Sequence, residues 1–206
     1  MSFEDNTRLL SAEPVSVPLC VCVFSSLEMR VHHALTNRPP WGPSDHLVRV
    51  DAALSQSGSL PLADLDVGAF DLEPDGDHYT REEYVRFAAQ LAHAVRGMPC
   101  PLIVSDSTID WHNHASVDEW TWTGWASEVL ETALGAGRGV VDVVCGSGFV
   151  ARAAQHEHFH ARVSRHLRAA DARITDVVLI GGWNDADRTA AACASAARLV
   201  SLVQRY

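Results

Sequence analysis

The stretch Ile174-Thr-Asp-Val-Val-Leu-Ile-Gly-Gly-Trp-Asn-Asp185 joins an apolar run to a glycine-rich, polar end. Its β-branched residues and the two glycines that close the run are typical of a buried strand followed by a turn. Apolar runs with a polar end occur twice earlier in the chain, in residues 101–108, which end in Ser-Asp-Ser-Thr, and in residues 140–148, which end in Gly-Ser-Gly. We therefore predict three strands, over residues 101–104, 140–145 and 174–180.

Helix signals separate these strands and extend to both sides of them. Thr80 and Glu83 have the spacing of a capping box, and apolar residues then fall on one helical face until Gly97. The remaining predicted elements are helices over residues 120–134, 149–169 and 185–204 and strands over residues 15–24 and 47–50. Alternating strands and helices predict an α/β fold in a single domain, residues 1–206, with a parallel sheet covered on both faces.

Composition excludes several classes of partner. The chain has 206 residues, with 16 Lys and Arg against 26 Asp and Glu, a net charge of −10 that disfavours nucleic acid and anionic lipid. It has no apolar run of about twenty residues for a membrane span. An acidic N-terminus without a long apolar segment predicts no signal peptide, hence a cytoplasmic protein. The five cysteines are predicted to be free buried thiols of a reducing compartment.

Three polar segments follow the last three predicted strands. They are Ser105-Asp-Ser107, Gly146-Ser-Gly148 and Gly181-Gly-Trp-Asn184. The carboxyl ends of parallel strands meet at one edge of a sheet, where ligands bind in such folds. We therefore expect a hydroxyl, a glycine loop and a carboxamide to lie close together.

Two of these segments resemble sequence blocks of the SGNH (GDSL-type) hydrolases. Ser105-Asp106-Ser107 is similar to the Gly-Asp-Ser block, which implies that Ser107 is the nucleophile, although Ser105 replaces the family glycine. Gly182-Trp-Asn184-Asp is similar to the Gly-x-Asn-Asp block, which implies that Asn184 donates a hydrogen bond to the oxyanion. Gly148 stands where the family has its oxyanion-hole glycine.

The base of such a site is expected from an earlier segment. Asp75-Gly-Asp77-His78 is similar to the Asp-x-x-His block of the family, which implies that His78 is the base and Asp75 its carboxylate partner. Asp77 is an alternative carboxylate. In the family this block follows the other three, whereas here it precedes them. Joining Tyr206 to Met1 restores the family order, so the resemblance implies a circular permutation.

The resemblance implies both a fold and an activity. The fold is a three-layer α/β/α sandwich with a five-stranded parallel, flavodoxin-like sheet of SGNH type. The activity is hydrolysis of small carboxylic esters, or acyl transfer from them, without a cofactor or a metal ion. The acyl group and the alcohol stay open, and acetylated carbohydrates are among the candidates. The sequence does not indicate an oligomeric state.

Two other functions compete with this hypothesis. The segment Gly146-Ser147-Gly148 after a strand also resembles the nucleotide-binding turn of dinucleotide enzymes and of S-adenosylmethionine methyltransferases. Those folds need an acidic residue at the end of the next strand. Here that strand ends in Leu179-Ile-Gly-Gly182, and no carboxylate follows it before Asp185. The third possibility is a binding module that has the fold and no activity.

Histidines and tryptophans supply further candidates. His156 and His160 share a face if residues 149–169 are helical, and Glu157 lies between them in the spacing of a zinc-binding His-Glu-x-x-His. His158 points elsewhere on such a helix, and we predict a solvated face and no metal site. The tryptophans that follow Ser107 are expected either in the core or as a platform for a sugar or acyl group. They are Trp111, Trp120, Trp122 and Trp125.

Overall fold

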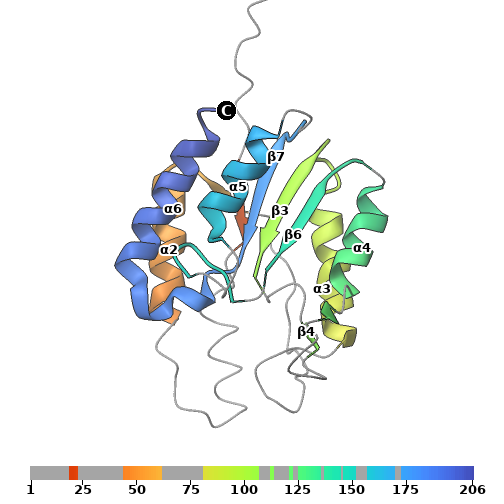
Figure 1. Cartoon of the computed structure of the whole chain (residues 1–206), viewed down its shortest axis with the longest axis horizontal. Coiled ribbons are helices and arrows are strands. Elements are labelled where there is room, and N and C mark those ends of the chain that lie inside the picture. Colours follow the sequence, from red (N-terminus) through yellow and green to blue (C-terminus); the bar gives the residue numbers. More distant parts are fainter. Residues whose placement is uncertain are drawn as a thin grey trace, which may run out of the picture.

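The molecule is built around a parallel sheet with helices on both of its faces (Figure 1). The computed structural model describes residues 19–22, 44–61, 81–106, 112–113, 121–122, 125–135, 137–144, 146–151, 157–169 and 173–206. Thr80 of the predicted capping box lies outside this set.

Three strands form the centre of the sheet: β3 (Pro101–Ser105), β6 (Val140–Val143) and β7 (Asp176–Ile180). β3 lies in the middle, where Leu102 is in register with Val177 of β7 and with Val140 of β6. Beyond β7, β1 (Leu19–Cys22) pairs with it in parallel, and the two-residue β2 (Leu60–Pro61) pairs with β1. The predicted α/β class with a parallel sheet is confirmed.

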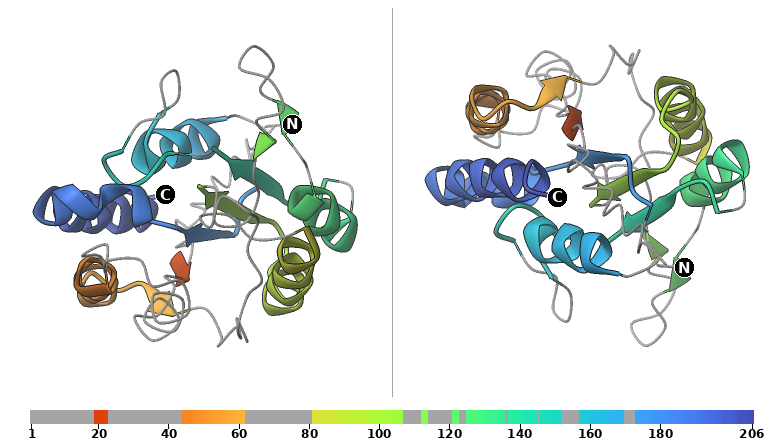
Figure 2. Two further views of the ribbon diagram at one scale, coloured as in Figure 1. Left: turned by 90° about the horizontal axis from the view of Figure 1, so that it is seen from below. Right: turned by 90° about the horizontal axis from the view of Figure 1, so that it is seen from above.

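Side chains alternate between the two faces of these strands, as the two-residue period of a strand requires. Leu102 and Leu179 pack with α2 (Ser44–Gln56), α5 (Phe159–Arg168) and α6 (Thr189–Val203). Ile103 and Ile180 pack on the opposite face with α3 (Arg81–Ala94) and α4 (Trp125–Leu134). Both views in Figure 2 show α2 beside α6 and α3 beside α4. Each face of the sheet is therefore covered by its own apolar cluster.

The predicted strand over residues 47–50 is wrong, because these residues belong to helix α2. A four-residue apolar run has no periodicity of its own that separates a strand from a buried helical turn. Val50 and Leu54, four residues apart on one helical face, are fully buried in the cluster that contains α6. Packing against α6 thus decides the conformation of this segment.

The predicted helix over residues 149–169 is correct only in its second half. Helix α5 begins at Phe159, and the side chain of His158 caps it by accepting a hydrogen bond from the backbone N–H of Ala161. The backbone N–H groups of residues 149–151 are bound by the carboxylate of Asp185 instead of entering a helix. Residues 149–151 are thus held by a long-range contact, and residues 152–156 lie outside the described set.

Other boundaries shift by a few residues. The helix predicted from residue 120 begins at Trp125, after the short β5 (Thr121–Trp122), which pairs antiparallel with β4 (His112–Asn113). The last helix begins with a 3-10 turn, η1 (Trp183–Arg188). Cys100 and Cys193 are free thiols, as predicted, but both are half-buried and not buried. No helix within the described residues is long and apolar enough to cross a membrane.

Replacing Leu54 by Ala tests the packing of α2 on α6. Leu54 is 0% exposed, and we expect the free energy of unfolding to fall by about 2–5 kcal/mol, because the lost apolar contacts leave a cavity. Denaturant unfolding measures this change. The neighbouring Ser55→Ala, on the exposed side of the same helix, is the control. Equal stability of the two variants would contradict the observed orientation of α2.

Candidate active site

The structure describes two of the five predicted site residues, Gly148 and Asn184. Ser107, His78 and Asp75, together with the alternative carboxylate Asp77, lie outside the described residues. Asp106, the neighbour of Ser107, is described and is buried at the end of β3. The described part of the candidate site consists of the end of β3, which precedes Ser107 in the sequence, and the ends of the neighbouring strands β6 and β7.

The side chain of Asn184 joins two strand ends. Its Nδ2 donates hydrogen bonds to the Oδ2 of Asp106, at 3.3 Å, and to the backbone carbonyl of Ser147, at 2.9 Å. Asp106 precedes Ser107, and Ser147 precedes Gly148. The carboxamide and the glycine loop thus lie together beside the segment that leads to Ser107, as expected from the order of the strands.

The buried carboxylate of Asp106 fixes the turn after β7. Its Oδ2 also accepts a hydrogen bond from the backbone N–H of Gly182 at 3.2 Å. Gly181 has a φ of +133°, and a Cβ at this position would lie 2.4 Å from that oxygen. Only glycine allows the backbone to approach the carboxylate so closely. The hydroxyl of Ser105, which replaces the glycine expected before Asp106, is fully buried, and its Oγ has no hydrogen-bond partner among the described residues.

The carboxylate of Asp185 fixes the glycine loop. It is fully buried and accepts hydrogen bonds from the backbone N–H groups of Phe149, Val150 and Ala151, at 2.6, 3.0 and 2.6 Å. A Cβ on Gly148 would lie 2.4 Å from this carboxylate. Burial of an anion is unfavourable unless hydrogen bonds replace its hydration, and three amide donors do so here.

The two predicted oxyanion donors have acceptors within the protein. The N–H of Gly148 donates to the carbonyl of Ala151 at 3.1 Å, and Asn184 Nδ2 donates to Asp106 and Ser147 as described above. An oxyanion role requires at least one of these donors to exchange its acceptor for the oxygen of a substrate. The described geometry brings the donors near one another without leaving their N–H groups unpaired.

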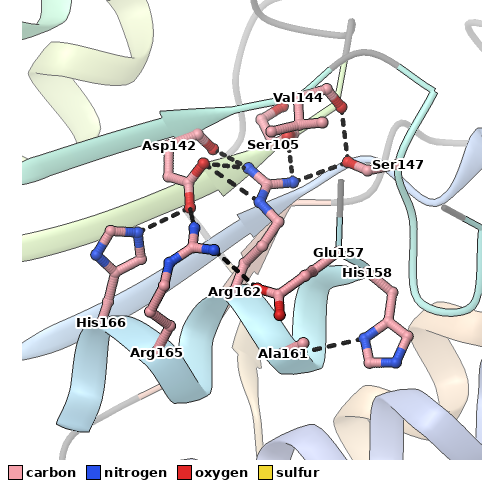
Figure 3. A network of polar contacts seen from close by, with 10 residues as sticks. All are labelled: Ser105, Asp142, Val144, Ser147, Glu157, His158, Ala161, Arg162, Arg165 and His166. Carbon is pink, nitrogen blue, oxygen red and sulfur yellow. Dashed lines mark hydrogen bonds and ion pairs between the residues drawn. The ribbon is translucent and has the colours of Figure 1, made fainter. Parts of the chain in front are cut away.

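A buried ion pair supports the same edge of the sheet and was missed by the sequence analysis (Figure 3). Arg162 of α5 is only 1% exposed and pairs with Asp142 of β6, with 2.8 Å between Nη2 and Oδ1. Its Nη1 donates to the carbonyl of Ser105 at 3.1 Å and to Ser147 Oγ at 2.8 Å. One guanidinium therefore contacts the ends of both strands that flank the candidate site.

The carboxylate of Asp142 is stabilised by the basic side chains around it. Burial raises the pKa of this carboxyl, but the hydrogen bonds and positive charges of Arg162 and His166 outweigh burial and place the pKa below its ordinary value. His166 Nε2 lies 2.8 Å from the second carboxylate oxygen. The signal in the sequence was a charged residue inside the apolar run Val140-Val-Asp-Val143, since a buried carboxylate requires a partner.

The predicted face of His156 and His160 is described only in part. His158 precedes α5 as its N-cap, and His156 lies outside the described residues. Burial and the positive charges nearby lower the pKa of His160. Within the described segments, no group of three His, Cys, Asp or Glu side chains could hold a metal ion. Of the four tryptophans, Trp122 lies in β5 and Trp125 opens α4, whereas Trp111 and Trp120 are outside the described residues.

Gly181→Ala tests the close approach of the backbone to Asp106. Both the positive φ and the contact with the carboxylate oppose a side chain, so we expect the free energy of unfolding to fall by about 2 kcal/mol or more. Gly97→Ala is the matched control, because a Cβ there meets nothing within 4 Å. Chemical denaturation of both variants measures the free energy of unfolding. A Gly181→Ala variant as stable as Gly97→Ala would refute the described turn.

The pKa of Asp142 predicts a pH dependence of stability. Because the pKa is lowered on folding, the unfolded chain binds this proton more readily. The stabilisation is therefore complete above about pH 4 and is lost as the pH falls through the lower pKa of the folded state. Unfolding of wild type and Asp142→Asn, followed from neutral to acidic pH, should show a stability difference that shrinks on acidification. A difference that grows on acidification would contradict the described ion pair.

Comparisons with models of protein families, with curated proteins and with solved structures find no significant match to this chain. The likeness to the SGNH hydrolases therefore depends on its four short sequence blocks and on the way the strands are arranged.

Proposed function

We propose that this chain is a serine hydrolase of the SGNH type, circularly permuted, with all its blocks in a single domain over residues 1–206. It cleaves small carboxylic esters, or transfers acyl groups from them, through an acyl-enzyme on Ser107. His78 is the base, Asp75 orients it, and Gly148 and Asn184 supply donors to the oxyanion.

The contact of Asn184 with two strand ends carries this proposal. Its amide touches the residue before Ser107 and the residue before Gly148. Serine hydrolases need the nucleophile and the oxyanion donors within a few ångström of one carbonyl group. Residues from three separate blocks of the resemblance thus lie together at one edge of the sheet. Short motifs that occurred by chance would not be expected to lie together.

The order of the strands is a second, independent support. Along the sheet the order is β2-β1-β7-β3-β6. For a permuted chain the strands are numbered from β3, the strand that leads to Ser107. β3 is then first, β6 second, β7 third, β1 fourth and β2 fifth. Read from β6, the order along the sheet is 2-1-3-4-5. This is the flavodoxin-like order. A permuted SGNH domain of five parallel strands accounts for both the strand order and the early position of Asp75 and His78.

The proposed reaction follows the chemistry of an activated serine. His78 accepts the hydroxyl proton as Ser107 Oγ attacks the ester carbonyl, and Asp75 stabilises the imidazolium that forms. Collapse of the tetrahedral intermediate breaks the bond to the alcohol, which takes the proton from His78. Water or another hydroxyl then attacks the acyl-enzyme with His78 again as the base. Oxyanion donors are worth about 3–4 kcal/mol each in such reactions.

The nucleotide-binding alternative is disfavoured by the same loop. In a nucleotide-binding turn, the backbone N–H groups after the glycines face a phosphate. Here the N–H groups of residues 149–151 face the carboxylate of Asp185. A phosphate placed there would be repelled by this buried anion and would have to displace it.

Ser107→Ala tests the nucleophile. We expect kcat/KM for p-nitrophenyl acetate to fall by roughly 10⁴-fold or more, because the attacking oxygen is removed. We also expect a fluorophosphonate probe to label wild type and not the variant. Circular dichroism should show an unchanged fold. Ser201→Ala, on the exposed face of α6, is the control for a hydroxyl lost elsewhere.

Three outcomes would overturn the proposal. Equal turnover by Ser107→Ala and wild type would exclude Ser107 as the nucleophile. A wild-type protein that neither reacts with the probe nor hydrolyses esters of graded chain length or acetylated sugars would be a binding module without activity. Thermal stabilisation by S-adenosylmethionine would point to the nucleotide-binding alternative.

A further inference from the structure

The side chain of Arg162 is the most deeply buried charge on the helices that cover the described strands, and no sequence block accounts for it. It extends from α5 toward the carboxyl ends of β3 and β6 (Figure 3). Burial of a guanidinium is costly unless all its donors are satisfied. Its contacts therefore indicate what the side chain does.

All five N–H groups of Arg162 have acceptors within the protein. Nε and one hydrogen of Nη2 are directed at Asp142 Oδ1, at 3.2 and 2.8 Å, and the other hydrogen of Nη2 at the Asp142 carbonyl. Nη1 donates to the carbonyl of Ser105 and to Ser147 Oγ. No donor is left over for a substrate, so a direct role in binding an ester or a carboxylate is excluded for this geometry.

The two acceptors of Nη1 belong to the proposed active site. Ser105 lies two residues before Ser107, and its carbonyl also accepts the backbone N–H of Val144. Ser147 lies next to Gly148, and its carbonyl accepts the amide of Asn184. A single nitrogen thus sets the separation between the strand that leads to the nucleophile and the loop that holds the oxyanion glycine.

We infer that Arg162 is a positioning residue of the proposed esterase, which fixes the distance between the end of β3, the strand that precedes Ser107 in the sequence, and the loop that contains Gly148. The inference rests on the proposed function. Asp142 supplies the opposite charge that keeps the guanidinium buried, and it is held in turn by His166. The carboxylate, the guanidinium and the two strand ends form one continuous hydrogen-bonded unit.

Lysine cannot replace arginine in this role. A lysine ammonium is a point charge with three donors on one nitrogen, whereas the planar guanidinium reaches acceptors on two sides at once. Arg162→Lys therefore keeps the charge opposite Asp142 and loses the simultaneous contacts with Ser105 and Ser147. This separates positioning from simple charge balance.

The experiment compares Arg162→Lys with Arg165→Lys. Arg165 lies on the same helix, is 57% exposed and contacts the same carboxylate at 3.3 Å. Among the described residues its ion-pair partners are Asp142 and Glu157, so it contacts neither Ser105 nor Ser147. For a p-nitrophenyl ester at a temperature where both variants are folded, we expect kcat of Arg162→Lys to fall roughly 10- to 100-fold with KM changed by less than about threefold. Arg165→Lys should retain kcat within about twofold of wild type. An Arg162→Lys variant with wild-type kcat would overturn the inference.

A second variant covers the case in which Arg162→Lys does not fold. Ser147→Ala removes one acceptor of Nη1 and leaves the ion pair with Asp142 in place. We expect its kcat to fall roughly three- to tenfold, a loss that corresponds to one hydrogen bond, while Ser201→Ala keeps the wild-type value. Unchanged kcat in Ser147→Ala would overturn the inference as well.

Amide hydrogen exchange separates this inference from the proposed function. If wild type neither hydrolyses esters nor reacts with a fluorophosphonate, the proposed function fails and kinetics cannot judge Arg162. Amide exchange can still test the role of Arg162, in peptides that cover residues 101–106 and 146–151. We expect roughly tenfold faster exchange there in Arg162→Lys, or in Ser147→Ala if the lysine variant is unfolded, than in the matching control. Equal exchange in variant and control would show that Arg162 does not hold these two segments.

Discussion

The geometry of the strand ends depends on one buried anion, the carboxylate of Asp185. It binds three consecutive backbone N–H groups, those of residues 149–151, which belong to no helix. The loop that contains Gly148 is thereby attached to η1, which carries Asn184. Because Asn184 and Asp185 are neighbours in the chain, the same interaction that holds the loop also places the carboxamide against it. An apolar side chain at position 185 would leave three amides without partners in the interior.

The edge of the sheet differs from its centre in how it is stabilised. The centre consists of apolar side chains, whereas the edge contains three carboxylates, those of Asp106, Asp142 and Asp185, each largely removed from water. Asp106 and Asp185 are compensated by backbone amides and the Asn184 amide, and Asp142 by Arg162 and His166. Hydrogen bonds in such surroundings are directional and costly to break. The edge is therefore rigid in the way that a preorganised site requires, and an apolar core alone would not give this rigidity.

Local patterns in the sequence predicted what depends on local structure. The apolar runs that end in glycine or serine placed β3, β6 and β7 correctly, and the capping box followed by an amphipathic pattern placed α3. The errors have a common cause. Residues 47–50 became helical where they pack against α6, and residues 149–151 bind Asp185 outside any helix, so each segment contacts residues more than thirty positions away. Within the site, the approach of Asn184 to the glycine loop followed from strand order, but the partnership of Arg162 with Ser105 and Ser147 followed from no periodicity. The arrangement of Ser107, His78 and Asp75 stays a prediction.

The packing of α2 on α6 links the early part of the chain to its very end (Figure 1). Leu54 and Val50 lie in one cluster with Leu199 and Val203, and the side chain of Gln204 donates to the carbonyl of Ser57 at 3.2 Å. During synthesis on the ribosome, the apolar face of α2 would have to wait until α6 has emerged from the exit tunnel. Domains with many such distant pairings fold slowly and expose apolar surface before completion. The α2–α6 layer is thus expected to form later than the α3–α4 layer, whose two helices lie closer together in the chain.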